Sequence, residues 1–588
     1  MDEQKNIGQT GNPVRGTSAG WKPEQEQPKP AKGWQPPAEN PPPQNAEQAP
    51  PPQRPISPYS AAAWEKGETE TRIPAAKPPK KSFQADKWDG IFALVFFVVS
   101  YLLLRWEVLW RGSGLRVGVF TLLYGGTVLC YAKGKKIAIR RESWFWFAMM
   151  LGCALGCSLW GPLSVSDGGY WVVQILFLLG MAVYWPMSLS GALFSGKTDN
   201  WMPLDMVRGF FTLPFGNFGC GASAIGQNAA KIRQGRTLLG ILLGVLISIP
   251  ILGIVLPQLM SADVGFQNLI ERFFDNILHY LATFLLYGIF AVPTSCYLYG
   301  LAAGCFHKRY PEKSPRDYEK SVGSLHLLPM ATLYTALGIV CFVYLLFIGV
   351  QAGYLFSAFR GACPEGYSSY AEYARKGFFE LCRVAAFNGA VLLAANVFSR
   401  KPCREAAALK GFNIALSLLT ILLLTTAFSK MALYVSAYGL SVRRFLPCWF
   451  MAFLTVCFLM VIVLQFTSFS IVRGVAVTGA VMFVLLCLIN VNGVIAGYNL
   501  SRYQKGTLPD FDLSGVYDYG LSGVGPALKL YQSTQDEADR KEAGWYLYRM
   551  CVSAEFENSS WLDMTAQSLY AEKALAPLKD ELQTARPF

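Results

Sequence analysis

Residues Ser368–Phe398 read SSYAEYARKGFFELCRVAAFNGAVLLAANVF, and the change of character inside this stretch decides the fold class. The stretch begins charged and rich in tyrosine. From about residue 377 it becomes an apolar run, long enough for a membrane-spanning helix of about 20 residues. Glu380, Arg383 and Asn388 lie inside the run. At 100° per residue they share a sector of roughly 140°, so we expect a spanning helix with one polar face.

The composition of the whole chain supports the same interpretation. Of the 588 residues, 52% are hydrophobic and 15% are charged, whereas a typical soluble chain carries about 25% charged residues. The charges cluster in short segments between long apolar runs, which is typical of a multi-pass membrane protein. We therefore predict an all-α, polytopic transmembrane helix bundle whose main partner is the lipid bilayer.

We count eleven apolar runs along the chain, and the pattern allows one more or one fewer. They lie near residues 88–106, 115–132, 144–165, 169–192, 237–260, 277–303, 325–350, 377–398, 409–428, 446–466 and 472–497. Most are long enough to span a bilayer as a helix. The third and fourth runs are separated by only a few residues around Asp167, so we expect them to form a tight hairpin.

Basic residues in alternate loops orient the chain in the membrane. The segments after the second, fourth, sixth and eighth runs carry the excess of lysine and arginine, as in AKGKKIAIRRES at residues 132–143. Loops with such an excess face the cytoplasm. We therefore place the N-terminus in the cytoplasm and, with eleven spans of the cytoplasmic membrane, the C-terminus outside. A miscount of one span would move only the C-terminal region.

Two flanking regions differ from the membrane domain, which we assign to residues 86–500. Residues 1–85 are rich in Pro, Gln, Glu and Lys, so we expect a disordered cytoplasmic tail without a signal peptide. Its PxxP patterns either dock in an aromatic groove of a partner protein or belong to a plain solvated tether. Residues 501–588 show amphipathic patterns, which predict a small helical extracytoplasmic region.

Several classes of ligand are disfavoured by the placement of charged and metal-binding residues. The net charge of +13 does not indicate nucleic acid, because much of the Lys and Arg lies in short loops that set membrane topology. Most of the 14 cysteines lie inside apolar runs, where they behave as small hydrophobic residues. The three histidines, His279, His307 and His326, are scattered. We therefore predict no metal ion and no cofactor.

The polar residues of the eighth run have two interpretations. Glu380 and Arg383 are spaced at i, i+3, so they can form an ion pair on one helix face. That face either lines a polar pathway inside the bundle or lies in the outer headgroup zone and anchors the helix. Asn388 is deeper in the run, and we expect it to hydrogen-bond to a neighbouring helix.

A second candidate segment is KMALYVSAYGLSVRRF at residues 430–445. Lys430 and Tyr434 share a helix face, and Gly439 is placed to end the helix. Arg443 and Arg444 are suited to hold an anionic lipid headgroup or the carboxylate of a solute. The alternative is an ordinary interfacial belt of tyrosine and arginine.

The connection at residues 195–236 is long and only weakly polar. Met206, Phe210 and Phe211 alternate with Asp205 and Arg208, and this pattern predicts an amphipathic helix on the membrane surface. The glycine-rich FGNFGCGASAIG that follows lacks a phosphate-binding spacing, and it favours a hinge or close backbone packing.

Several of these segments together resemble a known family. LISIPILGIVLPQLMSADVGFQNLIERFF, YAEYARKGFFELCRVAAFN and KMALYVSAYGLSVRRF, with YNLSRYQKG and SSWLDMTAQSLYAEKAL near the end, are similar to the bacterial membrane families catalogued as domains of unknown function 4153 and 4173. The resemblance covers roughly residues 88–570. It implies a multi-spanning, permease-like inner-membrane protein, and it supplies no substrate and no catalytic residue.

Three functions are consistent with the sequence. A permease-like or solute-handling protein is supported by the number of spans and by the buried polar groups. An envelope sensor or scaffold would use the two flanking regions. A lipid-linked transferase would need metal-binding acids such as Asp510 and Asp512, but a turn or helix cap explains this DFD segment more simply. The absence of a convincing catalytic motif favours a protein without enzymatic activity.

Overall fold

The computed structural model describes residues 83–111, 114–161, 170–231, 235–309, 328–350, 352–355, 370–400, 405–508 and 517–583. In this part of the chain the secondary structure is helical, apart from one β-bridge between Leu328 and Ser399. The predicted all-α class is therefore confirmed for these residues, which belong to one unit, Lys80–Phe588. Most of the tail at 1–85, the DFD segment with Asp510 and Asp512, and His326 lie outside the described residues.

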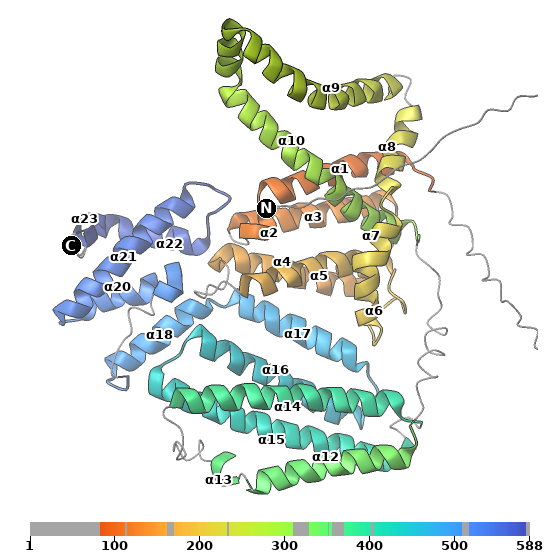
Figure 1. The fold of residues 1–588 in the computed structure, drawn as a ribbon. Helices are drawn as coiled ribbons and strands as arrows, with labels where there is room; N and C mark the ends of the chain where they lie inside the picture. Colours follow the sequence, from red (N-terminus) through yellow and green to blue (C-terminus); the bar gives the residue numbers. More distant parts are fainter. Residues whose placement is uncertain are drawn as a thin grey trace, which may run out of the picture. The chain divides into compact units, whose positions relative to one another are not determined.

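Ten helices among the described residues are long and apolar enough to cross a membrane. They are α1 (Lys87–Arg105), α3 (Leu115–Gly134), α4 (Arg141–Trp160), α5 (Tyr170–Ser190), α10 (Val264–Phe306, spanning from Ala282), α12 (Met330–Val350), α14 (Tyr370–Phe398, spanning from Glu380), α15 (Ala407–Tyr438), α16 (Val442–Leu464) and α17 (Ile471–Leu488) (Figure 1). These match ten of the eleven predicted runs. A multi-pass membrane protein is the class that they indicate.

The eleventh predicted run, near residues 237–260, is a bent helix. It lies in α9 (Gly235–Ala262), whose two parts, Leu243–Leu252 and Ile254–Ala262, meet at an angle of 45°. Pro250 and Pro257 lie inside α9, and proline bends a helix because it removes a backbone hydrogen bond and clashes with the preceding turn. The described residues therefore give eleven candidate spans if this bent pair is one broken span, and ten if it is a re-entrant loop.

The remaining helices are shorter or follow the spans. They are α2 (Val108–Arg111), α6 (Met202–Val207), the π-helix η1 (Arg208–Thr212), α7 (Leu213–Gly216), α8 (Cys220–Lys231), α13 (Ala352–Leu355), α18 (Val491–Gln504), the 3₁₀-helix η4 (Tyr517–Gly523), α20 (Val524–Ser533), α21 (Glu537–Asn558), α22 (Ala566–Leu575), the 3₁₀-helix η5 (Ala576–Leu578) and α23 (Lys579–Gln583).

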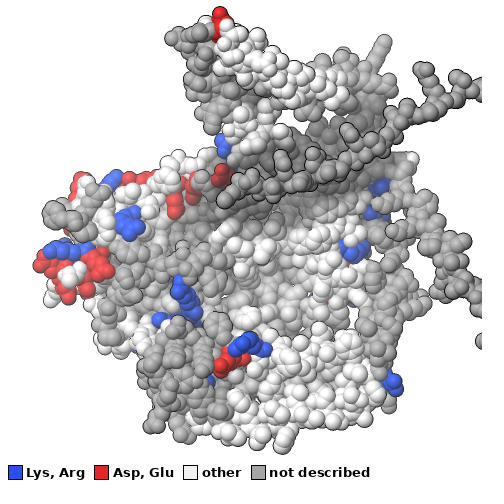
Figure 2. Space-filling view, viewed as in Figure 1, with Lys and Arg blue, Asp and Glu red and all other residues white. Residues whose placement is uncertain are grey.

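The spans form two helix groups, each with its own core. In the first group, α1, α3, α4, α5, α8 and α10 bury large aromatic side chains that include Tyr131, Trp146 and Tyr299. In the second group, α12, α14, α15 and α16 share a core of leucine, alanine and methionine. Figure 2 shows that charged residues on the visible face lie mainly near the helix ends, with wide uncharged surfaces between them. Such surfaces suit contact with lipid.

Helix α17 connects the two groups. Its residues Val484 and Cys487 pack on Cys153 of α4, and the indole nitrogen of Trp160 donates a hydrogen bond to the carbonyl of Leu488 (2.8 Å). The predicted run 472–497 was too long, because the helix ends at Leu488. The Asn490 side chain accepts the Gly493 N–H (2.9 Å) and starts α18 as a separate helix, as an N-cap does.

The C-terminal residues form the small helical region that the sequence predicts. Its buried side chains, such as Tyr546 and Leu547, belong to a core that also contains Val442 and Leu446 of α16. The segment between α21 and α22 is attached to the first helix group. Arg116 forms an ion pair with Asp563, and its N–H donates to the carbonyl of Leu562 (3.0 Å). The region therefore packs on the spans instead of forming an independent core.

The segment predicted as an amphipathic surface helix forms α6, η1 and α7. Asp205 and Arg208 are buried, and an oxygen of Asp205 lies 3.0 Å from the Arg208 guanidinium. Phe211, by contrast, is 62% exposed. The charged residues face inward because they neutralise each other there. The Phe211 side chain points away from the protein core.

Candidate functional site

The predicted Asn388 lies in the middle of a chain of buried hydrogen bonds between three spans. The Tyr344 hydroxyl of α12 donates to its side-chain oxygen (2.7 Å), and its amide donates to the Thr420 hydroxyl of α15 (2.8 Å). Asn388 and Thr420 are fully buried. The expected hydrogen bond from Asn388 to a neighbouring helix is therefore confirmed. This layer places two hydroxyls and one amide in an otherwise apolar core.

A second polar layer lies eight residues further along α14, toward its C-terminus. The Asn413 amide of α15 donates to Asn396 of α14 (3.1 Å) and to Gln465 at the end of α16 (3.3 Å). Asn413 and Gln465 are buried. Three side-chain amides thus meet and hydrogen-bond between the helices, as polar side chains do inside membrane bundles.

A third layer lies toward the N-terminus of α14 and brings together two of the predicted residues. The Lys430 side chain of α15 is buried, and the carboxylate of Glu380 attracts its ammonium group electrostatically. The predicted i, i+3 pair of Glu380 with Arg383 is not formed among the described residues, and both side chains are exposed.

The three layers form a discontinuous polar seam between α14 and α15, with apolar residues between the layers. On α14, Asn396, Asn388 and Glu380 follow at intervals of eight residues, or about 12 Å each at a rise of about 1.5 Å per residue. The seam therefore covers about 24 Å of a hydrocarbon layer about 30 Å thick. Ser417 lies between two layers with a buried hydroxyl that has no hydrogen-bond partner in the described structure. We define the polar seam as Tyr344, Glu380, Asn388, Asn396, Asn413, Ser417, Thr420, Lys430 and Gln465.

The other predicted residues gather at the end of α15. The Arg444 guanidinium lies 4.2 Å from the Tyr434 ring centroid and donates to the carbonyls of Tyr438 (2.7 Å) and Gly439 (2.5 Å). Gly439 ends the helix as predicted, with a φ of 76°. Arg444 thus satisfies carbonyls that a helix end leaves unpaired. Arg443 is exposed, and the binding of a headgroup or carboxylate by the two arginines stays a prediction.

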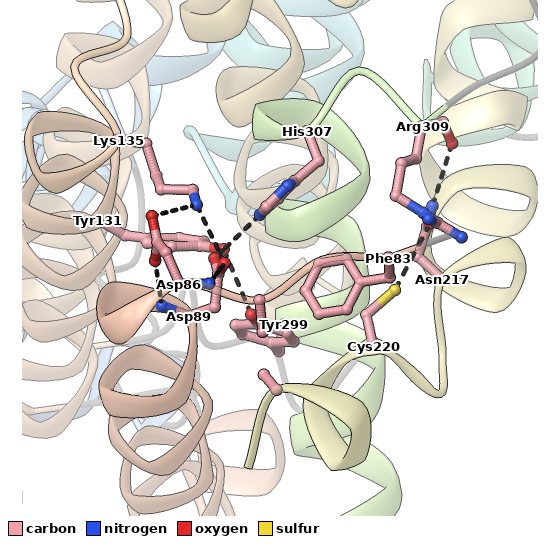
Figure 3. A network of polar contacts seen from close by, with 12 residues as sticks. Phe83, Asp86, Asp89, Tyr131, Lys135, Asn217, Cys220, Tyr299, His307 and Arg309 are labelled. Atoms are coloured by element: carbon pink, nitrogen blue, oxygen red, sulfur yellow. Dashed lines mark hydrogen bonds and ion pairs between the residues drawn. The ribbon is translucent and has the colours of Figure 1, made fainter. Parts of the chain in front are cut away.

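A second buried cluster, which sequence reasoning missed, surrounds Asp89 at the start of α1 (Figure 3). Its carboxylate is fully buried. One oxygen accepts hydrogen bonds from the Tyr131 hydroxyl of α3 (2.6 Å) and from His307 Nε2 at the end of α10 (2.9 Å). The other accepts the Asp86 N–H (2.8 Å) and the Lys135 ammonium (3.0 Å). Four donors therefore hold Asp89 as a carboxylate.

Aromatic and amide contacts extend this cluster toward α8. The Phe83 ring packs edge-on against His307, with centroids 4.9 Å apart, and the Arg309 guanidinium lies 5.6 Å from the Phe83 centroid. Arg309 also donates to the side chain of Asn217 (3.0 Å). Together these contacts join one end of α1, α3 and α10 and exclude water from the carboxylate. They do not form a metal site, since no metal-binding group of three acids, cysteines or histidines occurs among the described residues.

The sequence contains one local signal of this cluster. Asp86 and Asp89 form a capping box, in which each side chain accepts the backbone N–H of the other residue. An Asp-x-x-Asp spacing before an apolar run indicates a helix start. The spacing does not reveal that Tyr131, Lys135 and His307 converge on the second acid, because these residues come from helices distant in sequence.

Comparison with known proteins gives one match. A family model described as domain of unknown function (DUF4153) matches residues 136–523, about two-thirds of the chain. The matched residues contain the whole polar seam, whereas Asp89, Tyr131 and Lys135 precede them. No curated protein and no solved structure matches the chain. The similarity to family 4173 stays a prediction.

Proposed function

The chain belongs to the DUF4153 family, and from this premise we propose that it is a multi-pass protein of the cytoplasmic membrane with a permease-like function. It would bind a small polar solute and move it along the polar seam between α14 and α15. The family has no described activity, so this proposal is supported by the seam and not by the family name.

The observation that carries the proposal is the presence of polar groups at three depths of one helix pair. A polar or charged side chain in hydrocarbon costs several kcal/mol unless it is paired. Hydrogen bonds between helices account for the four amides, but the buried lysine and the serine hydroxyl without a hydrogen-bond partner in the described structure only add cost to a bundle that serves as an anchor. A pathway for a polar solute needs such groups, since they replace water around the solute.

The direct test is solute uptake by the purified full-length protein in liposomes, with labelled amino acids, sugars, organic acids and phosphate esters. We expect uptake of one class, and we expect Thr420→Val to reduce it roughly tenfold. The substitution keeps the side-chain volume and removes the hydroxyl that accepts from Asn388, and a lost hydrogen bond of about 1.4 kcal/mol corresponds to a factor of ten.

The matched control is Thr425→Val on the same helix. Thr425 is exposed and its hydroxyl bonds only to the carbonyl of Ile421 (2.8 Å) among the contacts of the described structure, so uptake should not change. Equal uptake by the two variants would contradict a role of the seam in transport. If no solute of the panel is taken up or stabilises the protein, the envelope sensor or scaffold becomes the better function.

A further prediction concerns orientation. Reporter fusions after Lys136, Lys313 and Arg404 should appear on the cytoplasmic side, and a fusion after the last helix should appear outside. The basic segments set this topology. In agreement, the structure brings together Asp86 before α1, Lys135 after α3 and His307 after α10, so these helix ends lie on one side. Alkaline phosphatase, which is active only outside the cytoplasm, is a suitable reporter. Phosphatase activity in the fusion after Lys136 would show that the topology is the reverse of the predicted one.

A further inference from the structure

The described residues include two fully buried aspartates, whose surroundings differ. Asp89 receives four donors, two on each oxygen. Asp205 receives the Phe194 N–H (3.0 Å) and the Arg208 guanidinium (3.0 Å), both on Oδ1. Its Oδ2 is buried and has no hydrogen-bond partner in the described part of the chain. A buried carboxylate oxygen without a donor loses its hydration and gains nothing in return, so the charged form of Asp205 is poorly supported.

The helix around Asp205 is irregular. Asp205 belongs to α6, and the π-helix η1 begins at its ion-pair partner Arg208. The Arg208 guanidinium lies 3.9 Å from the Phe194 ring centroid and is itself buried. Single π-helical turns are frequent at functional positions. The hydrogen bond from the Phe194 N–H to Asp205 also attaches this irregular helix to the loop at residues 191–201.

Other charged and titratable groups face the carboxyl from the surrounding elements. Asp199 of the same loop opposes the ionisation of Asp205, and Arg208 favours it. Tyr184 of α5 interacts electrostatically with Asp205, Asp199 and Glu142 of α4, and Cys305 of α10 interacts with Arg208. Burial outweighs the attraction of Arg208 and raises the pKa of Asp205 to about 6.

We propose that Asp205 is a proton-binding site, and that a proton bound at Oδ2 loosens the attachment of the loop at residues 191–201. The proton comes from water, forms the O–H bond of a neutral carboxylic acid and removes the negative charge that faces Arg208. The inference does not depend on the proposed transport function.

The loop that would respond is connected to the first helix group and to the start of α17. Thr198 accepts hydrogen bonds from Trp146 (3.1 Å) and Tyr184 (2.9 Å) in the first group. Asn200 accepts from the Ser470 hydroxyl (2.8 Å) at the start of α17, the helix that connects the groups. The loop backbone therefore links the hydrogen bond between Phe194 and Asp205 to the contact between Asn200 and Ser470 at the start of α17.

Infrared difference spectroscopy of the full-length protein in detergent tests the site directly. On passing from about pH 8 to about pH 5, a C=O stretching band of a protonated, buried carboxyl should appear with a midpoint near pH 6. The band should be lost in Asp205→Asn and shifted in Asp205→Glu. Asp199→Asn removes the same charge from the same loop and should keep the band. A spectrum of Asp205→Asn that keeps the full band, or a wild type without it, would overturn the proposal.

Thermal stability provides a second measurement. The folded protein binds this proton more tightly than the unfolded chain, whose pKa is near the ordinary value of 3.8. The contribution of Asp205 to stability is therefore present at low pH and is lost as the pH rises through about 6. The apparent Tm of Asp205→Asn minus that of the wild type should increase over this range. A difference that stays constant between about pH 4 and about pH 7 would contradict the site.

Discussion

Asp89→Ala should lower the free energy of unfolding by about 3–5 kcal/mol, because it removes the fully buried partner of Lys135 and leaves only the half-exposed Asp86 carboxylate beside it. The Lys135 side chain is only 11% exposed, so water cannot replace the carboxylate. Tyr131 and His307 lose an acceptor at the same time. The measurement is equilibrium unfolding of the purified protein in mixed micelles, followed by tryptophan fluorescence.

The matched control is Asp86→Ala, which removes the same charge three positions earlier. The Asp86 side chain is 51% exposed and also contacts Lys135 (2.8 Å). Its loss should cost about 1 kcal/mol, chiefly as the N-cap of α1, since exposed ion pairs contribute little. Adding Lys135→Met to Asp89→Ala should recover part of the stability, because no buried charge then remains. Equal costs for the two single substitutions would show that the Asp89 cluster is not a buried electrostatic unit.

The spans could be predicted from the sequence because the signal is local. A run of apolar residues identifies a spanning helix without any knowledge of its neighbours, and α4, α5, α12 and α16 lie where the runs place them. The run at 409–428 was predicted too short. Lys430 looks like the end of a span, yet α15 continues to Tyr438 and buries Lys430 inside the bundle.

The polar sites could be predicted only in part. Asn388 and Lys430 are visible in the sequence as polar residues in or beside apolar runs, but their partners Thr420 and Glu380 depend on how α14 packs on α15. The Asp89 cluster and the burial of Asp205 depend on contacts across more of the chain. Helical periodicity assigns a face to a residue, but it does not say whether that face meets water, lipid or another charge. For this reason the pattern around Asp205 predicted an amphipathic helix but not the burial of its charged residues.

Gly156→Leu should separate α17 from α4 and cost about 3 kcal/mol or more, since overpacking in a well-packed core typically costs 1–3 kcal/mol and here the obstacle is backbone. A Cβ atom at Gly156 would collide with the carbonyl oxygen of Cys487. One turn earlier, a Cβ at Gly152 would lie 2.6 Å from Val484 Cγ1. The two glycines let the helices approach closely, as small residues do at helix contacts in membranes.

The control is Gly126→Leu in α3, where a Cβ atom would meet no atom within 4 Å. It adds the same side chain to a spanning helix and should leave the apparent Tm nearly unchanged. Because α17 connects the two helix groups, Gly156→Leu should also increase hydrogen exchange at the start of α18, next to the lost contact. If instead both variants unfold at the temperature of the wild type, α4 and α17 are not in close contact, and the two groups are not joined by this helix.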